Sequence, residues 1–127
     1  MEVKIDTREK FHVITIKEAT LAANMTAELE KCLLPFLENE VKNIVCNLSS
    51  VKSVEEEVAG ELVKIQQQFY EQNASFVVCC LQPEVEEFLD KKELLELMNV
   101  TPTESEAWDI VQMEEIEREF FEGEEGL

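Results

Sequence analysis

The stretch from Asn47 to Leu62, which reads NLSSVKSVEEEVAGEL, constrains the fold of this chain more than any other segment. The continuous apolar run that leads into it (44–48) is typical of a strand covered on both faces. Three consecutive glutamates, Glu55, Glu56 and Glu57, then begin an amphipathic helix pattern. The sequence therefore predicts carboxylates at the N-terminus of a helix, beyond the C-terminal end of a buried strand. In open α/β sheets this edge is where functional sites usually lie.

Strand patterns precede this stretch. Apolar and polar residues alternate over 3–7 and 11–16, which predicts two strands joined through residues 9–10 as a hairpin. Phe11 and Val13 would face one side of the sheet, and the isoleucines of the same strand would face the other.

Helical patterns alternate with the predicted strands along the chain. A first helix would be capped by Asn24 or Thr26 and divided at Pro35, which cannot donate a backbone hydrogen bond. The second helix covers about 56–72. A short third helix has Pro83 in its first turn, where proline is tolerated.

The remaining elements complete an alternating order. A second buried strand is predicted over 76–81 and a brief edge strand over 99–102. Ser105 begins the last helix, with Glu106 in its first turn. This order predicts an α/β fold, a small four- to five-stranded mixed sheet with helices mainly on one face. The folded domain would cover 1–112.

The C-terminal segment, 113–127, is an acidic helix extension or tail in which Ile116, Phe120 and Phe121 interrupt a series of glutamates. Two interpretations are open. The segment is a helix end that frays into solvent, or it docks onto a partner with its aromatic residues as anchors.

The charge of the chain limits its partners. With a formal net charge of −18, nucleic acid and anionic membrane surfaces are poor partners, whereas a basic protein surface would be attracted. No apolar stretch is long enough to span a bilayer, and the N-terminus lacks the hydrophobic core of a signal peptide. We therefore expect a cytoplasmic protein that binds neither nucleic acid nor membrane.

The residues that usually carry catalysis are not arranged for it. His12, the sole histidine, falls on a hairpin strand, where a surface or edge position is expected. The cysteines show no C-x-x-C spacing, and the adjacent Cys79 and Cys80 would point to opposite faces of a strand. No glycine-rich phosphate loop is present. The sequence predicts neither an enzyme nor a cofactor.

The order of elements and the residues around the glutamates resemble the STAS domain, the family shared by sulphate transporters and anti-sigma-factor antagonists. The local cues precede the glutamates, follow them or lie near the end of the domain: Leu48, Ser49 and Val51; Gly60; and Thr103, Ser105 and Ala107.

In bacterial antagonists of this family the corresponding junction reads aspartate-serine-serine-glycine, and a partner kinase phosphorylates the first serine. The resemblance places Glu55 at the aspartate position, Glu56 at the phosphorylatable serine, Glu57 at the second serine and Val58 at the glycine. It implies an interaction module whose phosphorylation switch has been replaced by a fixed negative charge.

Three interpretations of the triplet are therefore open. Acids in a first helical turn are stabilised by the helix dipole, by about 0.3–1 kcal/mol each. Glu56 could act as a partial substitute for phosphoserine, which carries more charge than a carboxylate. A divalent-cation site ranks last, because adjacent residues at a helix start diverge in direction and calcium requires at least about six oxygen ligands.

The resemblance implies that the partner is a kinase-type anti-sigma factor. The contact surface would lie between Ser53 and Gly60, with help from the loop that contains Asn24. Its predicted partner-binding residues are Asn24, Ser53, Glu55, Glu56, Glu57 and Gly60. The alternative is a constitutive scaffold, or a subunit of a larger regulatory complex that is unrelated to sigma-factor control.

Overall fold

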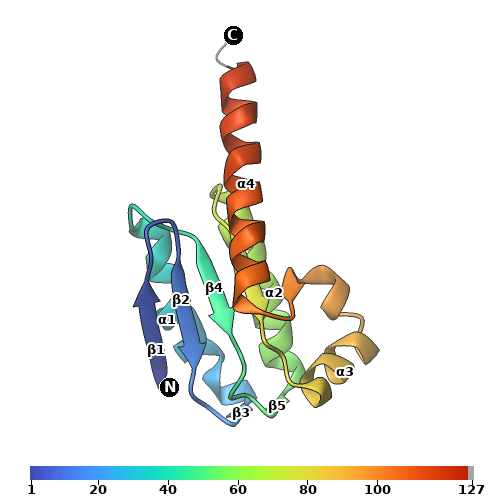
Figure 1. The fold of residues 1–127 in the computed structure, drawn as a ribbon. Helices are drawn as coiled ribbons and strands as arrows, with labels where there is room; N and C mark the ends of the chain where they lie inside the picture. Colours follow the sequence, from blue (N-terminus) through green and yellow to red (C-terminus); the bar gives the residue numbers. More distant parts are fainter. Residues whose placement is uncertain (126–127) are drawn as a thin grey trace.

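The structure is a computed structural model that describes residues 1–125, with side chains described up to residue 120. Within that range a five-stranded sheet has the order β1-β2-β4-β6-β7 (Figure 1). β1 (Val3–Thr7) runs antiparallel to β2 (His12–Ile16). Parallel pairs then join β2 to β4 (Ile44–Asn47), β4 to β6 (Phe76–Cys79) and β6 to β7 (Val100–Thr101). The α/β fold with a mixed sheet is confirmed.

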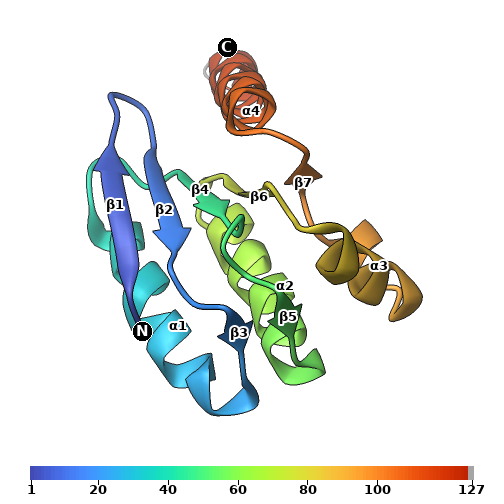
Figure 2. The same cartoon turned by 60° about the horizontal axis from the view of Figure 1, so that its bottom comes forward.

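Helices cover both faces of the sheet, but unequally. α1 (Thr26–Leu33), α2 (Glu56–Glu71) and α3 (Pro83–Lys91) contribute buried residues to one core, whereas α4 (Glu104–Glu125) covers the opposite face. Figure 2 shows α4 on one side of the strands and α1 and α2 on the other. The prediction of helices mainly on one face is therefore confirmed.

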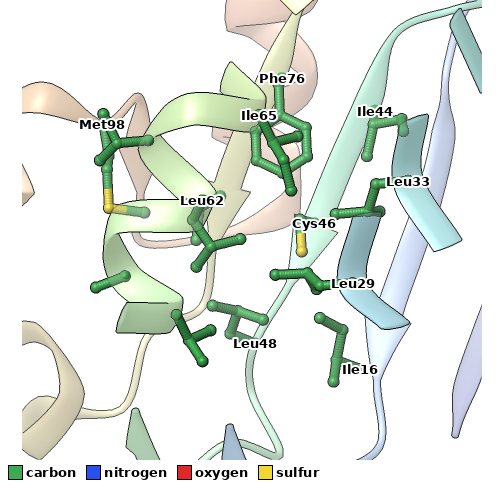
Figure 3. Packing of buried hydrophobic residues seen from close by; sticks show 14 of the residues in the cluster. Ile16, Leu29, Leu33, Ile44, Cys46, Leu48, Leu62, Ile65, Phe76 and Met98 are labelled. Atoms are coloured by element: carbon green, nitrogen blue, oxygen red, sulfur yellow. The ribbon is translucent and has the colours of Figure 1, made fainter. Parts of the chain in front are cut away.

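The larger core lies between the sheet and the first two helices. Figure 3 shows Leu62 and Ile65 of α2 together with Leu33 of α1 beside Cys46 of β4, and these four side chains are at most 1% exposed. Burial of an aliphatic side chain of this size contributes about 1.5–3 kcal/mol. The body of α2, and with it the start of the helix, is thus fixed to the sheet.

Strand alternation divides the residues between the two cores. Phe11 and Val13 pack in the smaller core against α4, while Ile14 and Ile16 pack in the larger one, as the sequence predicts.

The first helix is divided at the expected place, but it is not capped as expected. A 3₁₀ turn (Leu34–Glu38) containing Pro35 follows α1 directly. Asn24 lies in another 3₁₀ turn (Ala23–Met25), and Thr26 is already the first residue of α1. The preceding turn leads the chain into the helix, so neither of the two predicted residues occupies the cap position, which belongs to Met25.

One further expectation needs correction. The last α-helix begins at Glu104 rather than Ser105, and the hydroxyl of Thr103 accepts a hydrogen bond from the Glu106 amide at 3.2 Å. A 3₁₀ turn (Leu95–Leu97) lies between α3 and β7.

A two-stranded sheet that the sequence does not predict lies beside the main sheet. β3 (Thr20–Leu21) pairs in parallel with β5 (Ser53–Val54) (Figure 2). Two-residue strands are too short to show a period in sequence, which is why this segment reads as a polar loop. β5 connects β4 to α2 and therefore determines where the glutamates lie.

Candidate interaction site

The segment between β4 and α2 is fixed at both of its ends. After β4, the side-chain oxygen of Asn47 accepts a hydrogen bond from the Ser49 amide at 2.8 Å, and the Asn47 amide group donates to Glu104 at 2.7 Å. Leu48 and Val51 are buried in the larger core. The side chain of Gln82 donates to the Ser49 carbonyl at 2.8 Å. This loop is therefore anchored by polar and apolar contacts.

The small sheet then carries the chain to the helix. The Lys52 amide donates to the Ala19 carbonyl at 2.7 Å, and the Glu55 amide donates to the Leu21 carbonyl at 2.9 Å. The exposed hydroxyl of Ser53 donates to the hydroxyl of Thr20 at 3.1 Å. Ser53 thus lies on a short strand rather than in a free loop.

Glu55 occupies the N-cap position of α2 with an extended backbone. Its carboxylate accepts a hydrogen bond from the backbone amide of Ala23, in the turn that contains Asn24. The structure therefore brings the two segments of the predicted contact surface together, and Glu55 is the residue that connects them.

Glu56 and Glu57 lie in the first turn of α2, where the helix dipole favours negative charge. Glu56 forms an ion pair with Lys92, which follows α3, with 3.7 Å between Oε2 and Nζ. Both side chains are largely exposed, so this pair contributes no more than about 1 kcal/mol. Glu57 is also exposed to solvent. The Glu56 carboxylate is thus accessible and only partly neutralised.

Gly60 lies one turn further along the same face of α2 and is partly exposed. A Cβ atom built on it would meet no atom within 4 Å, and its backbone is helical. The fold itself therefore does not require glycine here, although glycine costs about 1 kcal/mol relative to alanine inside a helix. The bare backbone leaves space at the surface beside the glutamates.

Sequence reasoning missed two contributors to this site, Thr20 and Lys92. Both are distant from the site in sequence, and tertiary contacts bring Thr20 to Ser53 and Lys92 to Glu56. Within residues 1–125, no set of three or more His, Cys, Asp or Glu side chains is arranged to hold a metal ion.

The sequence predicts a surface or edge position for His12, and this prediction is wrong. The residue is 7% exposed on an inner strand. Its Nδ1 lies 3.1 Å from the hydroxyl of Thr7 and its Nε2 lies 3.0 Å from the Val41 carbonyl. The ring packs against Phe36, with 4.6 Å between centroids. Both ring nitrogens are engaged, which gives His12 a structural role.

Cys79 and Cys80 do not point to opposite faces, because β6 ends at Cys79 and Cys80 has a left-handed backbone with a φ of 63°. Both residues pack with the core beneath α4. Burial is the main cause that raises the pKa of the Cys79 thiol far above its usual range, with hydrogen bonding to Cys80 second. The thiol of Cys79 is therefore protonated and unreactive at neutral pH.

The fold and the strand-to-helix junction define a class of small α/β domains with a mixed sheet. The family model described as the STAS domain matches residues 2–107, and the chain belongs to this family. A search of curated proteins finds no match.

Several solved structures share the fold at low sequence identity. An anti-sigma factor antagonist from Mycobacterium paratuberculosis matches with a TM-score of 0.75 and 14% identity, over 87% of this chain and 93% of that chain. A serine-to-glutamate variant of RsbS from Moorella thermoacetica matches with a TM-score of 0.70 and 21% identity, over 88% and 96%. The phosphorylated form of the Bacillus cell fate determinant SpoIIAA matches with a TM-score of 0.62 and 14% identity, over 87% and 99%.

Among residues 1–125, no helix has both the length and the apolar character needed to cross a bilayer.

Proposed function

We propose that this chain is a non-enzymatic, cytoplasmic interaction module of the anti-sigma-factor-antagonist kind, and that its partner is a kinase-type anti-sigma factor. The observation that carries the proposal is that Glu56 is exposed in the first turn of α2. The family resemblance aligns this position with the phosphorylatable serine of the antagonists. The contact surface comprises Asn24, Ser53, Glu55, Glu56, Glu57 and Gly60.

The glutamates give this surface a fixed negative charge. Glu56 needs no kinase to acquire its charge, and its exposed pair with Lys92 leaves most of that charge open to solvent. At an interface built for a neutral serine, the carboxylate would lose its hydration without gaining a cationic partner, and an unpaired buried charge is costly. The native chain would therefore bind such a partner weakly, as a phosphorylated antagonist does.

Glu55 and Gly60 have different roles in this proposal. Glu55 holds the turn containing Asn24 against the start of α2, so it positions the surface. Gly60 provides close backbone approach to a partner, because the space above it is empty in the free chain.

A second candidate function is a constitutive scaffold within a larger regulatory complex. The observation that favours it is the engagement of both Glu55 and Glu56 by groups of the chain itself. A partner of this kind would bind the glutamate side chains directly, with Lys or Arg facing them.

The double substitution Glu56→Ser and Glu57→Ser tests the proposal by titration against a kinase-type anti-sigma factor at low and high salt. Tighter binding of the double variant supports the fixed-charge antagonist. Weaker binding with reduced salt dependence supports the scaffold function, in which basic residues of the partner face the glutamates. An unchanged affinity would mean that the triplet only stabilises its helix.

The chain offers a matched control. Glu84 and Glu86 lie in the first turn of α3 and are also exposed. Replacing both by serine removes the same charge from another helix start, and affinity should stay at the native level.

A second experiment uses Gly60→Ala, which should stabilise the free chain by about 0.5–1 kcal/mol and yet weaken partner binding.

A further inference from the structure

The second half of α4 carries an apolar stripe on the side away from the sheet. Met113, Ile116 and Phe120 are 59%, 65% and 63% exposed, respectively. Their spacing of three and four residues places them on one face of the helix. The opposite face of α4 is already used, since Ala107 and Val111 are fully buried against the strands.

A polar network fixes this half of the helix to residues that directly precede β4, β6 and β7. Ser75, which is 1% exposed, donates to Glu114 at 2.6 Å and accepts hydrogen bonds from Arg118 at 3.3 Å. Asn43 donates to Glu115 at 2.7 Å, and Asn99 donates to Glu114 at 3.3 Å. The stripe therefore lies on a helix whose rotation is set, which lowers the entropy cost of binding.

The stripe lies in strongly acidic surroundings. Over residues 104–119 Arg118 is the sole basic residue, and acidic residues far outnumber it. The acidic residues are Glu104, Glu106, Asp109, Glu114, Glu115, Glu117 and Glu119. At 100° per residue, Glu117 and Glu119 flank the stripe on its two sides, and both are exposed. A second copy of this chain would present the same charges and would be repelled.

The position of the stripe separates it from the start of α2. In Figure 1 the second half of α4 projects beyond the sheet, at the end of the molecule opposite to β5. A partner could therefore bind there without covering the glutamates of α2.

We propose that this face of α4 binds a basic amphipathic helix of another protein. Apolar side chains of that helix would pack against Met113, Ile116 and Phe120, as in helix-to-helix recognition at heptad-like spacing. Its Lys or Arg side chains would face Glu117 and Glu119. The flanking charges select the partner, because an acidic or neutral helix would gain no electrostatic attraction.

The test uses a synthetic amphipathic peptide about three heptads long, with Leu at the apolar positions and Lys at the flanking positions. Titration into the full chain should show saturable binding. A peptide with the same Leu positions and Glu in place of Lys should not bind.

Two variants locate the binding. Met113→Gln with Ile116→Gln should weaken binding of the Lys peptide about tenfold or more, the loss expected when central apolar contacts are removed. The control, Ile5→Gln with Leu97→Gln, changes two other exposed apolar residues (48% and 55% exposed) and should leave affinity unchanged. Circular dichroism should show the native helix content in both, since all four side chains are largely exposed.

Glu117→Gln with Glu119→Gln should weaken binding and reduce its dependence on salt, whereas Glu84→Gln with Glu86→Gln on α3 should not. Equal losses in the Glu117 and Glu119 variant and in the Glu84 and Glu86 variant would overturn the proposal, because binding would then follow net charge alone. A native dimer in sedimentation that the Met113 and Ile116 substitutions dissociate would also overturn it, by assigning the stripe to self-association.

Discussion

The start of α2 and the second half of α4 are both rich in glutamate, yet the two regions use the carboxylates differently. Glu56 and Glu57 face solvent at the end of a helix where the dipole favours them. Glu114 and Glu115 are half-buried far from the start of α4. Glu114 accepts hydrogen bonds from Ser75 and Asn99, and Glu115 accepts one from Asn43, and each donor directly precedes a strand of the sheet. Donors on the neighbouring elements, and not the residue type, decide which glutamates anchor the fold and which remain available to a partner.

The two regions also differ in how they are attached to the sheet. α2 is held through a continuous apolar face that includes Leu62, Ile65 and Phe69. α4 is held through a short apolar contact at its start and through a polar network further along. A region attached through apolar packing should lose more stability on truncation than one attached through hydrogen bonds.

The largest expected effect therefore comes from the apolar attachment of α2. Leu62→Ala and Ile65→Ala should each lower the free energy of unfolding by about 2–5 kcal/mol, because both side chains are at most 1% exposed and truncation leaves a cavity. Urea unfolding followed by circular dichroism measures the change. Midpoints close to that of the native chain would show that α2 is not held by this face.

The polar attachment of α4 should give a smaller effect. Ser75→Ala removes the hydroxyl that joins Glu114 and Arg118 and should cost about 1–3 kcal/mol, since both groups lose a partly buried hydrogen-bond partner. Urea unfolding measures the loss, and a glutamate-specific protease should cleave α4 faster.

Ser53→Ala is the matched control for that substitution. The Ser53 hydroxyl is exposed and bonds only to another exposed hydroxyl in the described structure, so its loss should change stability by less than about 0.5 kcal/mol. Equal effects at Ser53 and Ser75 would remove the distinction between an anchored and an exposed acidic region.

The periodic part of the fold can be predicted from sequence, because its signals are local. The buried runs of β4 and β6, the alternation in β2 and the amphipathic face of α2 each fix one element and its orientation. The break at Pro35 follows from the missing backbone donor.

The candidate site is only partly predictable, since its geometry depends on contacts between distant segments. The glutamates are visible in sequence, but the pairing of β3 with β5 and the approach of Lys92 to Glu56 are not. The position of His12 is predicted wrongly from sequence for the same reason. A histidine on a hairpin strand is expected at the surface, and here its ring is buried against Phe36 of the 3₁₀ turn that follows α1.

The acidic C-terminal segment, 113–127, shows a third limit of prediction from sequence. The sequence predicts a folded domain over 1–112 and a helix extension or tail over 113–127, and α4 continues from Glu104 to Glu125 across that boundary. Glu114, Glu115 and Arg118 are polar residues that a sequence pattern assigns to solvent, and their hydrogen-bond partners, Asn43 and Ser75, are distant in sequence. The side chain of Phe121 lies outside the described part of the structure, and a separate role for 113–127 remains a prediction.

The smallest expected effect concerns a third pair of acids, between α1 and α2. The pKa of Glu61 is raised above its ordinary value near 4.5, first by a hydrogen bond to Glu30, then by partial burial and by the charge of Glu30, while Lys64 opposes the shift. A raised pKa in the folded state means that folding favours the protonated carboxyl. The stability contributed by this pair is therefore complete below the ordinary pKa and is lost as the pH rises through the folded value.

Glu61→Gln should consequently make the chain more stable than the native protein at neutral pH, by a few tenths of a kcal/mol, because the amide keeps a hydrogen-bond donor toward Glu30 and cannot ionise. The gain should vanish below about pH 4, where the native carboxyl is protonated. Urea midpoints of both proteins between pH 4 and 7.5 measure it, and taking the difference removes the general effect of the −18 net charge. Glu57→Gln at the exposed start of α2 should show the opposite sign at neutral pH, since it loses the favourable interaction with the helix dipole. A stability difference for Glu61→Gln that does not change with pH would show that the two carboxyls do not share a proton.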